Sequence, residues 1–363
     1  MLGTPSAPCA YTTTLGTYLG VKRLDVPHSY GGMLDGMRAC LAAGGRHVVL
    51  EITSETLARG FSQLWPCDLG VFTNLSHDHL DAHGSVEHYF ASKAQLFHTL
   101  PSGARAVING NDEVAPLLAE VLPQGVELVS YGMSSRAREL PLAVIGHDPH
   151  IDWNGTHFSV EGVLSAGELL SVTVPTVGDI FAENAMAALA AAVASGVEPA
   201  LAAERLRRCP PIPGRFECVV ESPRVVVDYA HSPDALLRTL ETARKLCSGS
   251  LTLVFGAGGG RDRLKRPLMG QAAGLADRIL VTSDNPRREE PARIASEIVE
   301  GIEERAKARV MLDRREAIAC AIREAVEGDV VVIAGKGHET GQIIGDAVTP
   351  FSDREEARRA VQP

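Results

Sequence analysis

The sequence is poor in the features that mark secreted and membrane proteins. Aromatic residues make up only 5% of its 363 residues. Its seven cysteines are never spaced as Cys-x-x-Cys, and this spacing argues against a disulfide framework or a zinc ribbon. No apolar run approaches the roughly 18 residues needed to span a bilayer, and the first residues lack the basic and apolar regions of a signal peptide. We therefore expect a cytoplasmic protein without a membrane anchor.

The chain also has no excess of basic residues. Its net charge is −10 and its pI about 5.7, so no global positive field would attract DNA or RNA. What is present is 45% hydrophobic residues and 35 glycines, a composition typical of globular α/β proteins. A length of 363 residues allows two domains with separate cores.

The first part of the chain alternates strand-like and helical segments. Apolar runs at 47–52, 68–75 and 104–110 are separated by helical periodicity, most clearly at 85–100. This alternation predicts a mainly parallel sheet. Short alternating runs at 126–132, 157–162 and 169–175 then predict an antiparallel extension.

A proline-rich segment at 209–215, CPPIPGR, is the best domain boundary, and we predict domains at 1–214 and 215–363. After it, the alternation restarts with strand candidates at 224–230, 251–259, 278–286, 308–313 and 329–337. This pattern predicts a doubly wound domain, in which ligands bind beyond the carboxyl ends of the strands. The loops to examine are therefore 228–234, 256–263, 282–290, 312–316 and 335–339.

One group of residues has the chemistry of a cation site. Glu51 ends a strand, the segment 74–84 contains His79, and Lys93 follows in a predicted helix. Carboxylate and imidazole groups at strand ends can hold a divalent cation such as Mg²⁺ beside phosphates. The alternative is structural: Asp78 and His79 cap the next helix, and Lys93 is solvated.

The loop GAGGGRDR at 256–263 follows a strand but lacks the third spaced glycine of a dinucleotide fingerprint. Its cations suit a carboxylate or a phosphate, because guanidinium groups pair with oxyanions in bidentate geometry. A solvated basic loop is the alternative. The cations concerned are Arg261, Arg263, Lys265 and Arg266.

Two further loops, TSDNPRREE at 282–290 and GKGHE at 335–339, would lie on one edge of the second sheet. Arg287 would bind a carboxylate, while Asp284, Asn285 and Glu339 would receive an ammonium group, which together describe an amino-acid pocket. Ordinary turn chemistry at Asp-Asn-Pro is the alternative.

Eleven motifs, taken in order, resemble the Mur ligase family over nearly all of residues 11–360. They are LEITSETL, VFTNLSHDHLDAHG, ASKAQLF, GDIFAENAMAALA, PIPGRFE, VVVDYAHSPDAL, LVFGAGGGRDRLKRPLMG, VTSDNPRREEP, DRREAI, VVIAGKGHE and FSDREEAR. The resemblance is strongest to the members that add the third amino acid to a UDP-MurNAc-dipeptide. It implies a central Mur-ligase-type α/β domain followed by a C-terminal Rossmann-like domain.

The resemblance also implies a reaction. In the family, ATP phosphorylates a carboxylate, and the amine of an amino acid attacks the acyl-phosphate to form an amide. Lys93 matches a carbamylated lysine that binds magnesium, so that Lys93 and His79 would be catalytic and Glu51, His79 and Lys93 would hold Mg²⁺. The expected substrates are thus two small molecules, an amino acid and a carboxylate.

Other matched positions imply two binding sites. Those that match nucleotide contacts are Asn184, Arg215, His231, Asp234 and Asp313. Those that match the amino-acid pocket are Arg261, Asp284, Asn285, Arg287, Gly335 and Glu339. In the family, DNPR accompanies meso-diaminopimelate, whose distal carboxylate the arginine holds.

The sequence also departs from the family pattern. No segment matches the phosphate-binding loop G-T-N-G-K-T, and on the acceptor side DVP replaces T-T-P at Asp25–Pro27, Glu55 replaces a histidine and Phe61 falls near an expected arginine. These differences predict an amide ligase with a changed acceptor, whose ATP site is either reduced or completed by a partner chain that supplies the missing phosphate-binding elements. The alternatives are a non-catalytic amino-acid-binding protein and a truncated reading frame.

Overall fold

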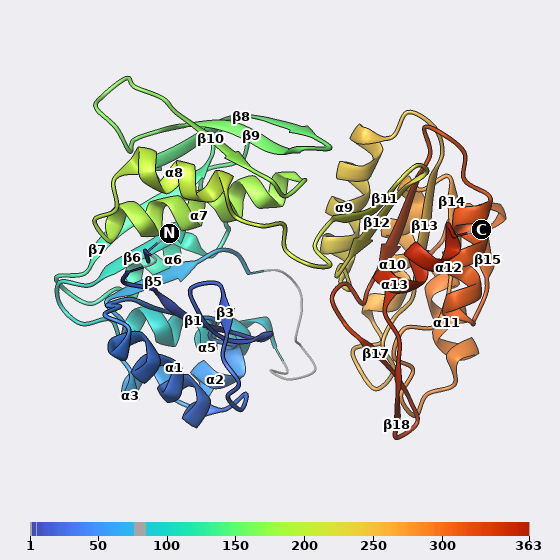
Figure 1. The fold of residues 1–363 in the computed structure, drawn as a ribbon, viewed down its shortest axis with the longest axis horizontal. Helices are drawn as coiled ribbons and strands as arrows, with labels where there is room; N and C mark the ends of the chain where they lie inside the picture. The colour runs from blue at the N-terminus through green and yellow to red at the C-terminus, as the bar shows by residue number, and fades with distance from the viewer. Residues whose placement is uncertain (1, 5, 76–84, 363) are drawn as a thin grey trace.

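The computed structural model of the chain describes residues 2–4, 6–75 and 85–362. It folds into two α/β lobes, coloured blue to green and yellow to red in Figure 1. Among the described residues, no helix combines the length and the apolar character that crossing a bilayer requires.

The N-terminal lobe contains two sheets. A four-stranded sheet has the order β3-β2-β1-β4, in which β1 and β4 are parallel and are connected through α1 (Tyr30–Ala42). Its strands are β1 (Ala10–Thr13), β2 (Gly16–Leu19), β3 (Lys22–Arg23) and β4 (Val48–Leu50). Two short helices follow β4, namely α2 (Ser54–Ala58) and α3 (Phe61–Leu64).

A six-stranded sheet has the order β10-β9-β8-β7-β6-β5. Its strands are β5 (Leu69–Phe72), β6 (Arg105–Asn109), β7 (Glu127–Met133), β8 (Val144–Asp152), β9 (Gly155–Glu161) and β10 (Leu170–Val174). The antiparallel extension predicted for the second and third alternating runs is confirmed at β9 and β10. For the first run the prediction is wrong: β7 pairs in parallel with both β6 and β8. A crossover through α6 (Ala115–Glu120) returns the chain to the same end of the sheet, which short-range alternation does not reveal.

Helices cover this sheet on both sides. On one side lies the alanine-rich α7 (Asp179–Ala194), which contacts β6, β7, β8 and β9 and is followed by α8 (Pro199–Arg207). Small side chains let α7 approach the strands closely, so most of its residues are buried. The predicted helix at 85–100 is α5 (Val86–His98), whose N-terminus is capped by the Ser85 hydroxyl.

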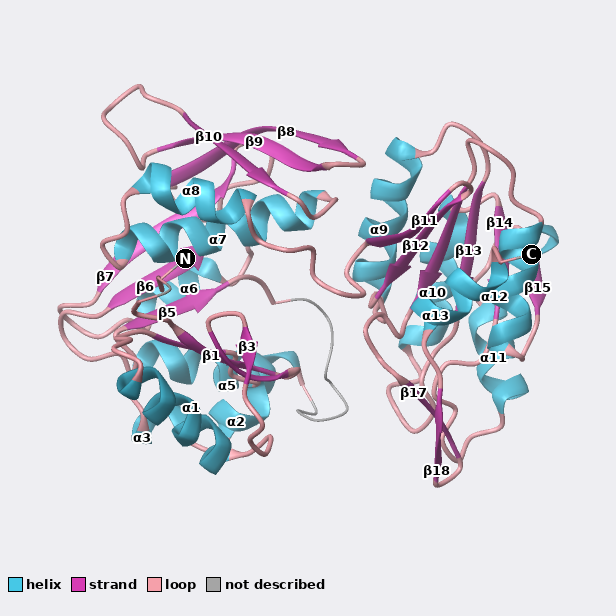
Figure 2. Cartoon of the chain, in the orientation of Figure 1, coloured by secondary structure: helices cyan, strands magenta, loops and turns pink. Residues whose placement is uncertain are grey.

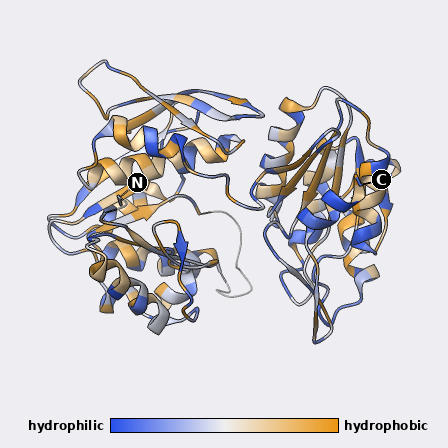
Figure 3. Cartoon of the chain, in the orientation of Figure 1, coloured by the Kyte–Doolittle hydropathy of each residue, from blue (hydrophilic) through white to orange (hydrophobic). Residues whose placement is uncertain are grey.

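The C-terminal lobe is the predicted doubly wound domain, with strand order β11-β12-β16-β13-β14-β15. Every pairing is parallel except β11 with β12. Its strands are β11 (Glu217–Glu221), β12 (Arg224–Asp228), β13 (Leu251–Phe255), β14 (Arg278–Val281), β15 (Ala308–Val310) and β16 (Val330–Ala334). All residues of β13 and β16 are buried, which explains their continuous apolar sequences (Figure 3).

Successive residues of these strands contribute to two different cores. One face packs on α9 (Pro233–Leu246), α10 (Lys265–Ala272) and α11 (Pro291–Glu300), and the other on α12 (Arg314–Arg323) and α13 (Asp353–Ala360). Figure 2 shows these helices on both sides of the sheet, with a separate hairpin of β17 (Gly341–Ile344) and β18 (Ala347–Pro350) at its edge.

Charged groups connect the two lobes. The buried Glu183 carboxylate on α7 lies 2.6 Å from the Arg136 guanidinium and 3.2 Å from that of Arg238 on α9. Burial raises the pKa of Glu183, and the two arginines oppose this shift. No helix or strand occupies residues 209–216 between the lobes, although the domain bounds themselves stay a prediction.

A buried ion pair lies at the centre of the C-terminal lobe. Arg314 and Asp353 are both 0% exposed and pair through two contacts of 2.7 Å each. Arg314 also donates to the carbonyl oxygens of Ala334, at 2.9 Å, and Ser283, at 3.4 Å. The ion pair therefore ties α12 and α13 to the carboxyl ends of β16 and β14.

We predict that Arg314→Met lowers the free energy of unfolding by about 3–5 kcal/mol, because it leaves the Asp353 charge buried without a partner. Urea unfolding followed by circular dichroism measures this loss. Removal of both charges in Arg314→Met/Asp353→Leu should recover part of it. Arg38→Ala, which breaks an exposed pair with Asp35, should leave the midpoint unchanged. Equal stability of Arg314→Met and the wild type would contradict this role.

Candidate functional site

The loops after β14 and β16 meet, as the strand order predicts. The Asn285 Nδ2 group donates to Glu339 Oε2 at 2.9 Å, and Lys336 Nζ donates to Asn285 Oδ1 at 2.9 Å. Lys336 Nζ also donates to Glu339 Oε2 at 2.7 Å. A carboxylate, an amide and an ammonium group thus form one network at the edge of the sheet.

Asp284 and Gly335 lie against each other beside this network. Gly335 has φ +115°, and a Cβ atom on it would lie 2.7 Å from Asp284 Oδ2. The Asp284 carboxylate accepts from the backbone N–H of Asn285 at 2.7 Å, and its carbonyl oxygen accepts from Gln342 Nε2 at 2.8 Å. Only glycine at position 335 combines this backbone conformation with so close an approach.

Arg287 lies on the other side of Asn285. Its Nη1 donates to the carbonyl oxygens of Gly259, at 2.8 Å, and Asn285, at 3.4 Å. Its backbone has φ +53° and is held by the β17–β18 hairpin, because its N–H donates to Ile343 O and its carbonyl accepts from Gly345 N–H. The hairpin therefore fixes a conformation that a non-glycine residue rarely adopts.

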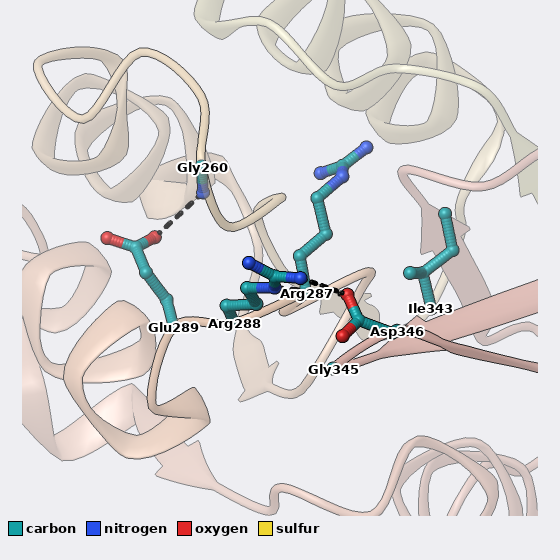
Figure 4. A pocket seen from close by; sticks show the side chains of 7 residues that line it. All are labelled: Gly260, Arg287, Arg288, Glu289, Ile343, Gly345 and Asp346. Carbon is teal, nitrogen blue, oxygen red and sulfur yellow. Dashed lines mark hydrogen bonds and ion pairs between the residues drawn. The ribbon is translucent and has the colours of Figure 1, made fainter.

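An open cavity of about 480 Å³ adjoins Arg287. Figure 4 shows the Arg287 side chain extending away from the Arg288–Asp346 ion pair, while Glu289 accepts from the Gly260 N–H on the opposite wall. The lining residues are Gly260, Arg287, Arg288, Glu289, Ile343, Gly345 and Asp346. Arg287 and Glu339 do not line it together: Glu339 is joined to Arg287 through Asn285.

Two cations of the 256–266 segment, Arg263 and Arg266, are already paired with acidic side chains. Neither interpretation of this loop, as an oxyanion-binding loop or as a solvated basic loop, predicted this pairing. Arg266 is 0% exposed and contacts Glu289 at 2.5 Å and Glu297 at 2.6 Å. Arg263 also pairs with Glu297. These contacts lower the pKa of Glu297 to about 2, since hydrogen bonds from Arg263 and Arg266 favour its charged form. The glutamates are distant in sequence, so the sequence pattern could not show this pairing. Arg261 is exposed.

Two of the residues matched to nucleotide contacts, Arg215 and His231, lie beside Tyr229. The Arg215 guanidinium stacks over the Tyr229 ring at 4.6 Å, and the rings of His231 and His338 lie 4.7 and 5.1 Å from it. Burial lowers the pKa of His338, as does Arg215, whereas Glu339 and Glu51 raise it. Glu51 belongs to the other lobe, so its charge acts on His338 from across the lobes.

The other three positions matched to nucleotide contacts either contact residues of the same chain or lie at the surface. Asp234 lies in the first turn of α9 near Arg238, at 3.5 Å. Asp313 caps α12 by accepting from the Glu316 N–H at 3.1 Å. Asn184 is an exposed residue of α7. Their binding roles stay predictions.

The chain between the lobes passes directly against the 335–339 loop. Phe216 donates its N–H to the fully buried Asp228 carboxylate at 2.6 Å. A Cβ atom on Gly214 would lie only 2.2 Å from the backbone of Gly337 and His338. This linker and the GKGHE loop are therefore in close backbone contact.

Of the predicted cation ligands, His79 lies outside the described residues. The Glu51 carboxylate accepts from the backbone N–H of Thr14 at 2.8 Å and from its hydroxyl at 3.3 Å. Lys93 Nζ donates to the carbonyl oxygen of Asn74 at 3.2 Å. Among the described residues, no group of three or more histidine, cysteine or acidic side chains is arranged to hold a metal ion. The role of Glu51, His79 and Lys93 in binding Mg²⁺ stays a prediction.

Sequence reasoning missed three charged residues of the site, Lys336, Arg314 and Asp353. All three are 0% exposed, whereas charged residues are expected at the surface unless they are paired. Their motifs, GKGHE, LDRRE and FSDREE, gave the only available signal.

This architecture and site agree with known families. Residues 4–192 match the Mur ligase middle domain, and residues 214–337 match the Mur ligase, glutamate ligase domain. The chain belongs to the Mur ligase family. Its predicted fold class, a Mur-ligase-type α/β domain followed by a Rossmann-like domain, is confirmed.

Comparison with individual sequences shows which members of the family the chain resembles. It is 43% identical to the UDP-N-acetylmuramoyl-L-alanyl-D-glutamate–2,6-diaminopimelate ligase of Thermosynechococcus vestitus over 337 residues, 90% of this chain and 65% of that protein. It is also 43% identical to the enzyme of the same name from Aquifex aeolicus, over 85% of this chain and 62% of that protein. The chain thus spans slightly less than two thirds of the length of these relatives.

Solved structures of other proteins also resemble the fold of this chain. A UDP-N-acetylmuramoyl-L-alanyl-D-glutamate–2,6-diaminopimelate ligase superposes with a TM-score of 0.63 at 34% identity, over 98% of this chain and 72% of that one. Folylpolyglutamate synthase from Mycobacterium tuberculosis, solved with ADP and AMPPCP, superposes with a TM-score of 0.70 at 19% identity, over 91% of this chain and 82% of that one. The second match concerns the fold alone.

We predict that Gly335→Ala destabilises the chain by about 1–2 kcal/mol more than Gly167→Ala. Both glycines have positive φ, but a Cβ atom at position 167 would meet nothing within 4 Å, whereas at position 335 it would displace the Asp284 carboxylate. Thermal unfolding of the two variants measures the difference. Equal melting temperatures would show that the contact with Asp284 has no effect.

Proposed function

We propose that this chain is an ATP-dependent amide ligase that joins an amino acid carrying a second carboxylate, meso-diaminopimelate or a related compound, to a carboxylate acceptor through an acyl-phosphate. The observation that carries this proposal is that Arg287 and Glu339 both contact Asn285, Arg287 through the backbone carbonyl and Glu339 through the side-chain amide. A guanidinium suits the distal carboxylate, and the Glu339 carboxylate suits the ammonium group. The names of the similar ligases support the choice of amino acid.

The chain's residues also suit a nucleotide and a divalent cation. Arg215 and the aromatic rings of Tyr229, His231 and His338 form a cationic, stacking surface at the lobe interface. Glu51 offers a carboxylate oxygen, the ligand type that Mg²⁺ prefers, and His79 and Lys93 are its proposed partners. When bound, the cation would neutralise phosphate charge at this interface. ATP and Mg²⁺ are accordingly our proposed cofactors, in a cytoplasmic enzyme.

We further propose that the acceptor differs from the one named in the similar ligases. Glu55 lies in the first turn of α2, which Thr53 caps, so an acidic side chain already occupies the positive end of this short helix. Asp25 adds a second exposed carboxylate in the same lobe. These two positions disfavour an anionic group where the family motif carries a histidine and a threonine.

We predict that Arg287→Ala raises the KM for meso-diaminopimelate about 10- to 100-fold, since a charge-assisted hydrogen bond to the distal carboxylate contributes about 1.5–3 kcal/mol. The KM for lysine, which lacks this carboxylate, should change little. ADP release with each amino acid and a panel of carboxylates, including UDP-MurNAc-dipeptide, measures both constants.

The matched control is Arg359→Ala, which removes another arginine of the same lobe, whose 59% exposed side chain pairs with Glu355 on α13. It should change the KM for meso-diaminopimelate less than threefold. Calorimetric titration separates binding from catalysis. Tight binding without amino-acid-dependent ADP would show a binding protein instead of a ligase, and no binding at all would end the amino-acid assignment.

A further inference from the structure

The backbone that leaves β5 is held by side chains from other elements. Strand β5 lies at the end of its sheet, and its pairing with β6 stops at Phe72. Backbone groups beyond such a point need other partners. In residues 72–75, which we call the strand-end segment, each residue has one backbone group bound by a different side chain. Tyr131 Oη donates to Phe72 O at 3.1 Å, Asn109 Nδ2 to Thr73 O at 2.8 Å and Lys93 Nζ to Asn74 O at 3.2 Å, and the Leu75 N–H donates to Asp112 Oδ2 at 2.9 Å.

These four side chains come from the end of the sheet where a ligand is expected. Asn109 is the last residue of β6, and Tyr131 lies in the second half of β7. Strands β5, β6 and β7 are parallel, so their carboxyl ends lie at one edge, and ligands of such sheets bind beyond that edge. The strand-end segment is therefore fixed in the place where a ligand would meet the backbone.

Asp112 and Asn109 are themselves held in place. Asp112 uses both carboxylate oxygens, because Oδ1 accepts from the Val114 N–H at 3.1 Å while Oδ2 accepts from Leu75. Asn109 is buried, and its Oδ1 accepts from the Asn111 N–H at 3.1 Å. This second contact leaves the amide nitrogen facing Thr73. Each side chain thus connects the strand-end segment to the turn between β6 and α6.

The same segment holds the end of the Lys93 side chain. Lys93 Nζ donates to the Asn74 carbonyl, lies 4.9 Å from the centroid of the Tyr89 ring and interacts electrostatically with Asp112. A lysine side chain is flexible, so its position depends on such contacts. Asn74 lies between the residues that Asn109 and Asp112 hold. A shift of the segment would move the Asn74 carbonyl, and Lys93 Nζ would lose its acceptor or move with it.

We propose that Asn109 and Asp112 are positioning residues of the cation site, which fix the strand-end segment and, through the Asn74 carbonyl, the position of Lys93. This inference rests on the proposed function, in which Lys93 takes part in binding Mg²⁺. The alternative is that both side chains only satisfy backbone groups and stabilise the lobe. The two roles differ in what they predict for cation binding.

Asp112→Ala tests the proposal, because it removes both acceptors of this carboxylate. We expect kcat for amino-acid-dependent ADP release to fall about 10- to 100-fold, the usual effect of losing an outer partner of a cation site or of a small misplacement. The KM for meso-diaminopimelate, whose proposed pocket lies in the other lobe, should stay within about twofold. Asp112→Asn keeps an oxygen that can accept from Leu75, so its kcat should stay within about threefold of the wild type. An equal loss in both variants would show that the charge matters and that the anchoring does not.

The matched control is Asp329→Ala. Asp329 is also a carboxylate that accepts from two backbone N–H groups, those of Ser250 at 2.7 Å and Val326 at 3.0 Å. It precedes β16, at the amino ends of the strands of the C-terminal sheet, and thus away from both proposed sites. This variant should lose stability but keep its kcat within about twofold. If it loses as much kcat as Asp112→Ala, the effect is one of stability alone.

A titration with Mn²⁺ in the presence of ADP, followed by electron paramagnetic resonance of the free ion, needs no catalysis. Mn²⁺ should bind about tenfold more weakly to Asp112→Ala than to the wild type or to Asp329→Ala. If no ADP forms from ATP but this difference appears, the ligase proposal fails while the positioning role stands. If ADP forms and Mn²⁺ binds equally to all three proteins, or does not bind to the wild type, the positioning role is wrong. Circular dichroism confirms folding, and Asn109→Ala, with the same expected result, replaces Asp112→Ala if that variant is unfolded.

Discussion

The buried pairing of Arg314 with Asp353 is the interaction on which the C-terminal site depends. Its two short contacts pair both fully buried charges, and the guanidinium also donates to the carbonyl oxygens of Ser283 and Ala334. Those carbonyls belong to the residues just before the Asp284 and Gly335 loops. One side chain thus holds two loops that are about fifty residues apart in sequence at a fixed separation, before any ligand arrives.

The loops of the candidate site are each stabilised by a different contact. Arg266 fixes the glycine-rich loop through Glu289, Lys336 fixes Asn285, and the β17–β18 hairpin fixes the backbone of Arg287. Because these contacts are made within the chain itself, the exposed atoms that remain are those available to a substrate. This arrangement reduces the ordering that binding would otherwise require.

The sequence predicted the architecture well where patterns are local. Continuous apolar strands and the helical periodicity at 85–100 each carry their own signal. The parallel placement of β7 could not be read this way, because strand direction depends on a crossover. The pairing of Arg263 and Arg266 with Glu297 and the burial of Lys336 depend on residues brought together only by folding. The candidate site residues were proposed from ordered motifs, since no single spacing specified them, and their roles stay predictions.

The contact of Gly214 with the GKGHE backbone has a consequence for motion. Phe216 is fastened to Asp228, and Gly214 lies against Gly337 and His338, so the linker from Gly214 onwards belongs mechanically to the C-terminal domain. Any rotation of one domain against the other must pivot earlier, among the residues around Pro210 and Pro211, where proline limits the available torsions. The linker from Gly214 onwards and the Asn285–Glu339 network then share one rigid body, and a rotation of this domain would move them as a unit.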